Sequence, residues 1–405
     1  MRSVCVVGAS LAGLLTARAL RAQGYDGRLI LVGEEIHRPY DRPPLSKDFL
    51  RGVLDDADLA LESDDEDLDA EWRLGVAAVG LDAAARRVTL SDGTEVEADG
   101  IVIATGASAR RLPGTDGLAG VHTLRTLDDA RALRHDLANA KRIVVIGGGF
   151  IGTEVAATAC DLGLDVTLVE SGQTPLAGVV GAQMAEAIAG LHERRGVRLL
   201  RSARVTALTG EERVDAVRLA DGTLLPADVV VVGIGASPNI AWLTGSGLLL
   251  GDGVLCDEGG AAIRDESGGQ ARENGGGKGG GPAAGIVAVG DCAAWFDPAI
   301  GRHDRCEHWT GARQRAAVAA ETLLSGGVAR PARPRPAYIW SDQFDVKIQF
   351  VGRARHADTV VVEEGDPADH SFLAVYRQGE RPVAVLGVNQ VRLFSRWRRQ
   401  LETAV

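Results

Sequence analysis

Residues 147–152 read Gly-Gly-Gly-Phe-Ile-Gly and come directly after an apolar stretch, Ile143–Ile146. The residues that follow, 150–162, have helical spacing, and a second apolar stretch, 166–169, ends at Glu170. This order predicts a strand, a tight turn, a helix and a second strand. Glycines allow the turn and the close packing of helix on strand, while free N–H groups at the helix start bind a pyrophosphate. We therefore predict a dinucleotide-binding unit whose turn contains Gly147, Gly149, Phe150, Ile151 and Gly152.

A second copy of this pattern begins near the N-terminus. A strand over 3–7 and a helix over 11–22 flank the residues Gly-Ala-Ser-Leu-Ala-Gly, and a further strand over 28–32 precedes two glutamates. Serine stands where the middle glycine is usual, but its side chain is small and can itself donate a hydrogen bond. The glutamates lie ~20 residues beyond the last glycine, where carboxylates accept hydrogen bonds from ribose hydroxyls. The predicted cofactor contacts are Gly8, Ser10, Leu11, Ala12, Gly13, Glu34 and Glu35.

The internal repeat extends beyond these turns. Hairpins with an Asp-Gly turn are expected at 88–94 and 217–223, and each precedes an apolar strand and a glycine, at 100–106 and 229–235. Several short strand-like runs follow a proline-rich stretch at 331–336. We therefore predict an α/β protein with two Rossmann-like dinucleotide-binding domains and a small C-terminal α+β domain. The expected boundaries are 1–108 with 238–325 for the first domain, 109–237 for the second and 326–405 for the third.

Residues 257–284 differ in composition from the rest of the chain. They contain ten glycines, and their only large aliphatic residue is Ile263. Such a segment buries too little apolar surface to offset the entropy of ordering it, so a flexible insert is predicted.

The composition excludes several classes of protein. The chain has 405 residues, 45% hydrophobic and 24% charged, which is typical of a soluble globular protein. It has no apolar run long enough for a membrane helix and no N-terminal leader pattern, so a cytoplasmic protein is expected. The five cysteines form no CxxC pair, which disfavours a disulfide scaffold or a zinc site. A net charge of −11 disfavours nucleic acid as a partner.

Two dinucleotide sites in one chain indicate two cofactors. A nicotinamide with a flavin is the economical pair, because a flavin accepts hydride and releases single electrons. Glu170 favours the free 2′-hydroxyl of NAD and repels the 2′-phosphate of NADP, so NADH is expected over NADPH. Gly235 is expected to let the nicotinamide approach closely.

Three motifs identify a family. Residues 38–47 read Arg-Pro-Tyr-Asp-Arg-Pro-Pro-Leu-Ser-Lys, residues 307–309 read Glu-His-Trp, and residues 340–343 read Trp-Ser-Asp-Gln. Together they resemble the FAD-dependent ferredoxin reductases of the putidaredoxin-reductase and rubredoxin-reductase types, which are glutathione-reductase-like flavoproteins. The resemblance covers nearly the whole chain apart from 257–284. It implies that electrons pass from NADH through FAD to a [2Fe–2S] ferredoxin, which serves a cytochrome P450 or a ring-hydroxylating dioxygenase.

The resemblance also implies roles for single residues. Two motifs, Ala-Thr-Gly and Gly-Asp, look like further FAD contacts of this family, and Trp309 like the residue against the pyrimidine side of the flavin. Two arginines resemble residues near the FAD pyrophosphate and adenine, with the backbone of Ala78 bordering the adenine. The two motifs contain Ala104, Thr105, Gly106, Gly290 and Asp291, and the two arginines are Arg42 and Arg125.

Lys47, Glu154 and Phe150 are the candidate catalytic residues. In the resembling family the lysine and glutamate positions form an ion pair beside the flavin N5, where a fixed cation stabilises negative charge on reduced flavin. The alternative is an exposed lysine and an acid that merely complements the helix dipole. Phe150 occupies the position of an aromatic ring that covers the flavin until nicotinamide displaces it; its alternative role is core packing.

Electrons are expected to leave the flavin directly. Disulfide reductases of similar architecture have a redox cysteine pair near residues 43–50, where this chain has no cysteine. Residues 301–405 carry a net charge of +4, against −15 for residues 1–300. This difference favours an acidic ferredoxin as partner, although the arginines could simply solvate the surface.

Other functions fit the same motifs. A rubredoxin or nitrite-linked reductase and an NADH oxidase are alternatives within the enzymes. A flavin-bearing redox sensor or interaction protein with poor turnover, like the apoptosis-inducing factors, is the alternative outside them. The chain is expected to be a monomer or a homodimer, with no membrane partner.

Overall fold

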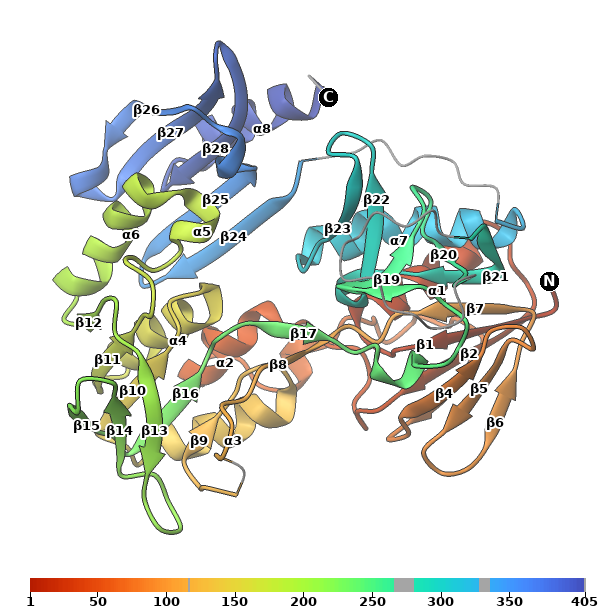
Figure 1. Cartoon of the computed structure of the whole chain (residues 1–405), viewed down its shortest axis with the longest axis horizontal. Helices are drawn as coiled ribbons and strands as arrows, with labels where there is room; N and C mark the ends of the chain where they lie inside the picture. Colours follow the sequence, from red (N-terminus) through yellow and green to blue (C-terminus); the bar gives the residue numbers. More distant parts are fainter. Residues whose placement is uncertain (116, 266–279, 328–335, 404–405) are drawn as a thin grey trace. The chain divides into compact units, whose positions relative to one another are not determined.

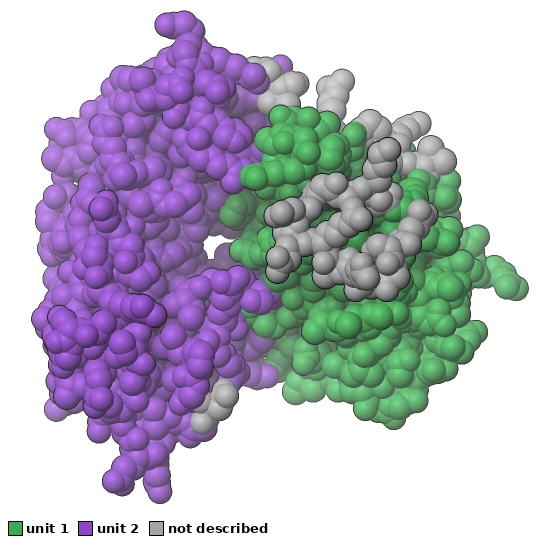
Figure 2. All heavy atoms as spheres, viewed as in Figure 1, with its two compact units in different colours: residues 1–41, 60–108, 238–334 green, residues 42–59, 109–237, 335–405 purple. Residues whose placement is uncertain are grey.

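The computed structural model describes residues 1–115, 117–265, 280–327 and 336–403. By its internal contacts the chain forms two compact units, and each unit is assembled from three separate segments. Unit 1 contains residues 1–41, 60–108 and 238–334, and unit 2 contains residues 42–59, 109–237 and 335–405 (Figure 2). Each unit has its own hydrophobic core.

Unit 1 combines a large sheet with two long helices. Its elements, in chain order, are β1 (Ser3–Val7), α1 (Leu11–Ala22), β2 (Arg28–Gly33), β3 (Ala70–Leu74), β4 (Ala78–Asp82), β5 (Arg87–Leu90), β6 (Glu95–Glu97), β7 (Gly100–Ile103), η3 (Ala241–Leu243), β18 (Leu250–Gly251), β19 (Gly253–Cys256), β20 (Ala261–Ile263), β21 (Pro282–Ala288), η4 (Gly290–Cys292), β22 (Ala293–Asp297), β23 (Arg302–Arg305) and α7 (Trp309–Leu324).

The strands of the large sheet follow the order β23-β22-β19-β20-β21-β7-β1-β2-β3, and β18 pairs with β19 (Figure 1). Strands β21, β7, β1, β2 and β3 run parallel. β1, β2 and β7 are buried along most of their length, which explains why they consist mainly of apolar residues. Because parallel strands end at the same edge, the loops after β1, β7 and β21 meet there. Helices α1 and α7 pack against each other, and β4, β5 and β6 form a small antiparallel sheet.

Unit 2 contains a second parallel sheet and an antiparallel C-terminal sheet. Its elements are η1 (Pro43–Ser46), α2 (Asp48–Arg51), η2 (Ala57–Leu59), β9 (Val121–His122), α3 (Leu127–Leu137), β10 (Arg142–Ile146), α4 (Phe150–Asp161), β11 (Asp165–Val169), α5 (Ala177–Val180), α6 (Ala182–Arg194), β12 (Arg198–Leu200), β13 (Val205–Thr209), β14 (Ala216–Leu219), β15 (Leu224–Pro226), β16 (Val229–Val232), β24 (Tyr338–Gln343), β25 (Val346–Gly352), η5 (Ala354–His356), β26 (Thr359–Asp366), η6 (Pro367–Asp369), β27 (Ser371–Gln378), β28 (Arg381–Val388) and α8 (Val391–Thr403). Strands β8 (Ala107–Ala109) and β17 (Ala236–Pro238) lie where the chain passes from one unit to the other.

The parallel sheet of unit 2 has the order β12-β11-β10-β16-β9, and β13, β14 and β15 form a separate antiparallel sheet. The C-terminal sheet has the order β24-β25-β28-β27-β26, and α8 packs on β28 and β25 (Figure 1). Strand β24 also contacts α4. The C-terminal sheet therefore packs directly against the helix that starts at the second glycine turn.

The prediction of a flexible insert over 257–284 does not hold at either end of that segment, where the chain forms strands. Strand β20 lies inside it and pairs with β19 and β21, and β21 begins at Pro282. The Asp257 side chain accepts hydrogen bonds from the N–H groups of Gly259 and Ala261. A Cβ at Gly260 would lie 2.3 Å from the Trp295 ring, so the small residues here allow the chain to pack closely on an aromatic side chain. Composition alone missed this packing. Residues 266–279 lie outside the described residues.

The compact units also divide the chain differently from the predicted domains. Residues 42–59 were predicted to belong with the N-terminal domain, and the C-terminal domain was predicted to be separate. Both segments instead form one compact unit with residues 109–237. Helix α4 contacts both η1 and β24. The assignment of each cofactor to its segments stays a prediction.

Candidate functional site

The turn after β1 can be made only with glycine. Gly8 has a φ of +120°, and a Cβ there would lie 2.0 Å from the carbonyl oxygen of Ala104. A Cβ at Gly13 would lie 1.9 Å from the carbonyl oxygen of Gly8. Helix α1 begins after Ser10 and has no acidic residue in its first turn. Its N-terminus therefore favours an anion such as a pyrophosphate.

Two other loops reach the same edge of the sheet. Residues 104–106 follow β7, and Thr105 Oγ1 donates a hydrogen bond to the carbonyl of Asn239 at 2.7 Å. Gly290, which precedes Asp291, has a φ of +79°, and a Cβ there would lie 2.8 Å from Cβ of Ala12. Three glycine-containing loops thus surround the start of α1. There is no room for a side chain at Gly8, Gly13 or Gly290. Backbone that can approach a ligand this closely suits the pyrophosphate of FAD.

The remaining predicted residues of unit 1 lie around this edge. Glu34 is exposed, while Glu35 is half-buried and accepts a hydrogen bond from the Tyr40 hydroxyl. Ala78 is the first residue of β4. Trp309 is the first residue of α7, and its Nε1 donates to Asp41 Oδ1 at 2.9 Å.

The turn after β10 in unit 2 repeats the geometry of the first turn. Gly147 has a φ of +102°, and a Cβ there would lie 2.3 Å from the carbonyl oxygen of Gly233. A Cβ at Gly152 would lie 1.9 Å from the carbonyl oxygen of Gly147. Helix α4 begins after Gly149 without an acidic residue in its first turn. This turn is a second site suited to a pyrophosphate.

Glu170, directly after β11, folds back onto the second turn. Its Oε2 accepts a hydrogen bond from the N–H of Gly148 at 2.7 Å, and its Oε1 accepts one from the N–H of Gly172. These bonds hold the carboxylate at the end of the strand, where a ribose hydroxyl binds in dinucleotide sites.

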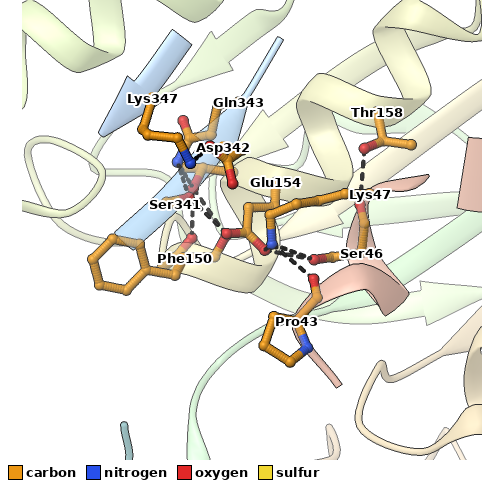
Figure 3. Close-up of polar contacts among 12 residues, drawn as sticks. Pro43, Ser46, Lys47, Phe150, Glu154, Thr158, Ser341, Asp342, Gln343 and Lys347 are labelled. Carbon is orange, nitrogen blue, oxygen red and sulfur yellow. Dashed lines mark hydrogen bonds and ion pairs between the residues drawn. The ribbon is translucent and has the colours of Figure 1, made fainter. Parts of the chain in front are cut away.

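Lys47 and Glu154 form a buried ion pair in unit 2 (Figure 3). Lys47 follows the short helix η1 and Glu154 lies on α4, and the distance from Nζ to Oε2 is 2.6 Å. The two side chains are 11% and 5% exposed. Lys47 Nζ also donates to the carbonyl of Pro43 at 2.9 Å, and Ser46 Oγ donates to the same Oε2 of Glu154. The alternative of an exposed lysine and a surface acid therefore does not describe this pair.

Burial makes the two charges depend on each other. Moving a single charge out of water costs several kcal/mol, which the pair offsets by mutual attraction and by hydrogen bonds. Thr158 Oγ1, one turn further along α4, donates to the carbonyl of Ser46 at 2.8 Å and holds η1 against the helix. The chain thus fixes one lysine ammonium group in a site almost closed to water.

The other predicted residues of the second turn are more accessible. Phe150, the first residue of α4, is half-buried, and its ring extends to the side away from Lys47 in Figure 3. Ile151 is 42% exposed. Gly149 and Gly235 are exposed, and Gly235 has a φ of +105°.

Arg42 and Arg125 lie together in unit 2. Arg42 Nη1 donates a hydrogen bond to the carbonyl of Arg125. The N–H groups of Arg125 and Thr126 both donate to Asp129 Oδ2, within the capping box that starts α3. The start of α3 therefore fixes the backbone that holds Arg42.

Sequence reasoning missed Ser46, Ser341 and Gln343. Ser341 Oγ donates to Glu154 Oε1 at 2.6 Å, and Gln343 donates to Ser341. Both residues stand in the Trp-Ser-Asp-Gln motif at 340–343, which carried the resemblance but was given no role. Their two-residue spacing on β24, which places both side chains on one face, was the available signal.

Comparison with known proteins identifies the family. The model of the pyridine nucleotide-disulphide oxidoreductase family matches residues 2–316, and the model described as reductase C-terminal matches residues 338–405. This chain belongs to the pyridine nucleotide-disulphide oxidoreductase family. It is 36% identical over 406 residues to the biphenyl dioxygenase system ferredoxin–NAD(+) reductase component of Paraburkholderia xenovorans, covering 100% of this chain and 94% of that protein. It is 34% identical over 398 residues to the putidaredoxin reductase of Pseudomonas putida, covering 96% and 89%.

Solved structures agree with this assignment. The covalent putidaredoxin reductase–putidaredoxin complex matches with a TM-score of 0.88 and 32% identity, over 99% of this chain and 93% of that chain. A ferredoxin reductase for the CYP199A2 system of Rhodopseudomonas palustris matches with a TM-score of 0.87 and 34% identity, over 98% and 94%. The predicted family and the predicted fold class, two Rossmann-like domains and a small C-terminal α+β domain, are confirmed.

This member of the pyridine nucleotide-disulphide oxidoreductase family has no disulfide. Its five cysteines, all within the described residues, are free. Cys5 is fully buried, and burial raises the pKa of its thiol to about 12. Among the described residues, no helix has the length and apolar character needed to cross a bilayer. The same residues contain no group of three or more His, Cys, Asp or Glu side chains that could hold a metal ion.

Proposed function

We propose that this protein is an NADH-dependent ferredoxin reductase with FAD as its resident cofactor. It passes electrons to an acidic [2Fe–2S] ferredoxin that serves a cytochrome P450 or a ring-hydroxylating dioxygenase. The observation that carries the proposal is the buried lysine of residues 43–50. Where disulfide reductases have their redox cysteines, this chain has Lys47, paired with Glu154 on the helix of the second turn.

The residues of each unit suit one of the two cofactors. FAD, when bound, accepts hydride from NADH and gives up electrons singly. The glycine loops around α1 would hold the FAD pyrophosphate, with Glu35 placed for a ribose hydroxyl. The turn after β10 and the carboxylate of Glu170 would hold NADH. The Lys47 ammonium group would supply fixed positive charge to the flavin, as the resemblance implies.

The relatives support the choice of partner. Several of them are named as ferredoxin reductase components of dioxygenase systems, and one structural match is a complex with putidaredoxin. The excess of basic residues over 301–405 suits an acidic partner. We place the enzyme in the cytoplasm.

Steady-state reduction of cytochrome c through added [2Fe–2S] ferredoxin tests the proposal. NADH should support ferredoxin-dependent turnover, and the rate should fall as salt rises from low to physiological ionic strength, because screening weakens the attraction between opposite charges. Turnover with rubredoxin alone would favour a rubredoxin reductase, and peroxide formation without any carrier would favour an NADH oxidase. NADH bound tightly with negligible turnover to any acceptor, ferricyanide included, would indicate the redox sensor.

A further inference from the structure

A chain of buried hydrogen bonds begins at the second oxygen of the Glu154 carboxylate. Oε2 faces Lys47, while Oε1 accepts a hydrogen bond from Ser341 Oγ at 2.6 Å. Gln343 Nε2 in turn donates to Ser341 Oγ at 3.0 Å (Figure 3). Ser341 and Gln343 have no exposed surface. Both carboxylate oxygens are therefore held, one by the lysine and one by the C-terminal sheet.

The chain continues from Gln343 into two helices. Gln343 Nε2 also donates to Thr153 Oγ1 on α4 at 2.9 Å, and Gln343 Oε1 lies 2.8 Å from His192 Nε2 on α6. Thr153 is fully buried, and His192 is 1% exposed. An amide oxygen only accepts hydrogen bonds, so the Nε2 of His192 must carry the proton.

Every hydrogen bond in this series has a fixed direction, because an amide nitrogen only donates and a carboxylate only accepts. His192 donates to Gln343, Gln343 donates to Ser341, and Ser341 donates to the carboxylate of Glu154. Burial lowers the pKa of His192, which favours the neutral ring that this arrangement needs. Its Nδ1 is buried without a partner among the described residues, so a proton there would be unsatisfied. Hydrogen bonds that point the same way strengthen one another.

We propose that Ser341, Gln343 and His192 are positioning residues for the Glu154–Lys47 ion pair. Without the Ser341 hydroxyl, the Glu154 carboxylate loses a charge-assisted hydrogen bond and can turn about its side-chain torsions. The ammonium group of Lys47 keeps its bond to the Pro43 carbonyl but loses a counter-charge of fixed position. The inference rests on the proposed function. It implies that the C-terminal domain affects the rate at which NADH reduces the flavin, because Ser341 and Gln343 belong to its sheet.

Anaerobic stopped-flow reduction of the holoenzyme by NADH is the first test. Ser341→Ala should slow flavin reduction about 10-fold, the usual effect of losing a hydrogen bond to a charged group. Ser341→Thr, which keeps the hydroxyl, should recover most of the rate. The Kd of NADH should stay within about twofold, because the hydrogen bond of Ser341 does not form part of the second glycine turn.

Tyr376→Phe is the matched control. Tyr376 is also buried in the C-terminal sheet, and its hydroxyl donates to the carbonyl of Val180. This bond is not part of the series of hydrogen bonds that ends at Glu154. Its loss should lower the melting temperature and leave the rate of flavin reduction unchanged. A purely structural role for Ser341 would give the same pattern in Ser341→Ala.

A double-mutant cycle shows whether Ser341 acts through Glu154. In the Glu154→Gln background, Ser341→Ala should reduce the rate less than twofold further. A full additional 10-fold loss would overturn the proposal, and so would an unchanged rate in Ser341→Ala alone. If Ser341→Ala fails to fold or to bind FAD, Gln343→Met removes the next bond of the chain, and it should slow flavin reduction by a smaller factor. A wild-type protein that NADH does not reduce would instead refute the proposed function.

Nitrogen NMR of 15N-histidine-labelled holoenzyme gives a readout that is independent of turnover. At pH 7 His192 should be neutral with its proton on Nε2, and Gln343→Met should change that signal without affecting FAD content. A neutral ring with its proton on Nδ1 would contradict the direction of these hydrogen bonds.

Discussion

The turn after β1 in unit 1 and the turn after β10 in unit 2 have the same backbone geometry but different helices behind them. In each turn the first glycine has a φ above +100°. A Cβ added at the last glycine of the turn would lie 1.9 Å from the carbonyl oxygen of the first glycine. Two residues beyond the last glycine, α1 has Leu15, which packs on the core of unit 1, and α4 has the buried Glu154. The common geometry suits a dinucleotide in both turns, and the residue two positions beyond the last glycine is charged only in α4.

The repeat also extends to the start of each sheet. Asp99, before β7, accepts hydrogen bonds from the N–H groups of Arg2 and Ser3. Asp228, before β16, accepts them from the N–H groups of Lys141 and Arg142. The same backbone arrangement is therefore built twice.

The largest expected effect follows from removing the charge of Lys47, which pairs with Glu154 behind the second glycine turn. Lys47→Ala should slow flavin reduction by NADH about 100-fold, because it removes a fixed cation. It should also lower the free energy of unfolding by about 3–5 kcal/mol, since Glu154 is left buried and unpaired. Stopped-flow spectroscopy and urea unfolding measure the two effects.

Lys47→Met combined with Glu154→Gln should recover much of the stability but none of the rate. Leu15→Ala, at the matching position in unit 1, should reduce stability with little change in the rate constant. A wild-type rate of flavin reduction in Lys47→Ala would contradict the proposed role of this charge.

The two turns should control different cofactors. Gly147→Ala forces a Cβ to within 2.3 Å of the carbonyl oxygen of Gly233 and should weaken NADH binding at least about 10-fold while FAD content stays normal. Gly8→Ala should instead lower the FAD content of the purified protein. Gly163→Ala is the control, because Gly163 also has a positive φ but a Cβ there would have no atom within 4 Å. Loss of the same cofactor in both variants would contradict the division of roles.

The carboxylate of Glu170 should set the choice between NADH and NADPH. Glu170→Ser should lower the ratio of kcat/KM for NADH to that for NADPH about 10-fold, because it removes the repulsion of the 2′-phosphate. Glu35→Gln, which alters the corresponding carboxylate in unit 1, should leave the ratio unchanged. Steady-state kinetics with both nucleotides distinguish the two variants, and an equal response would show that Glu170 does not select the nucleotide.

The smallest expected effect concerns the two aspartates at the start of the sheets. The Arg142 side chain and two backbone N–H groups lower the pKa of Asp228 to about 2. The stability it contributes is present above its ordinary pKa and is lost as the pH falls through about 2. Asp228→Asn should cost about 1 kcal/mol at pH 7 and progressively less below pH ~4. Asp99→Asn should cost less, because the exposed Arg2 side chain lies 4.0 Å from the Asp99 carboxylate, whereas Arg142 donates to Asp228 at 2.7 Å. Urea unfolding at several pH values compares the two variants.

Regular parts of the fold were predictable from the sequence. The strand at 3–7 and the helix at 11–22 have the expected bounds, because local apolar patterning and glycine determine them. The strand β20 was missed, since its alanines are buried by pairing with β19 and β21 and the adjacent Gly260 packs on Trp295 from another part of the chain. The hydrogen bonds of Ser341 and Gln343 were missed for the same reason. The bonds from Ser341 to Glu154 and from His192 to Gln343 join residues more than 150 positions apart, and no local pattern specifies such a contact.

The central claim is that NADH reduces the flavin and that electrons then leave singly for a ferredoxin. An anaerobic titration measures this directly: the purified holoenzyme is reduced with one equivalent of NADH and then mixed with oxidised [2Fe–2S] ferredoxin. The account predicts that the flavin absorbance bleaches with NADH and returns as two equivalents of ferredoxin are reduced. A reduced flavin that persists in the presence of ferredoxin would contradict it.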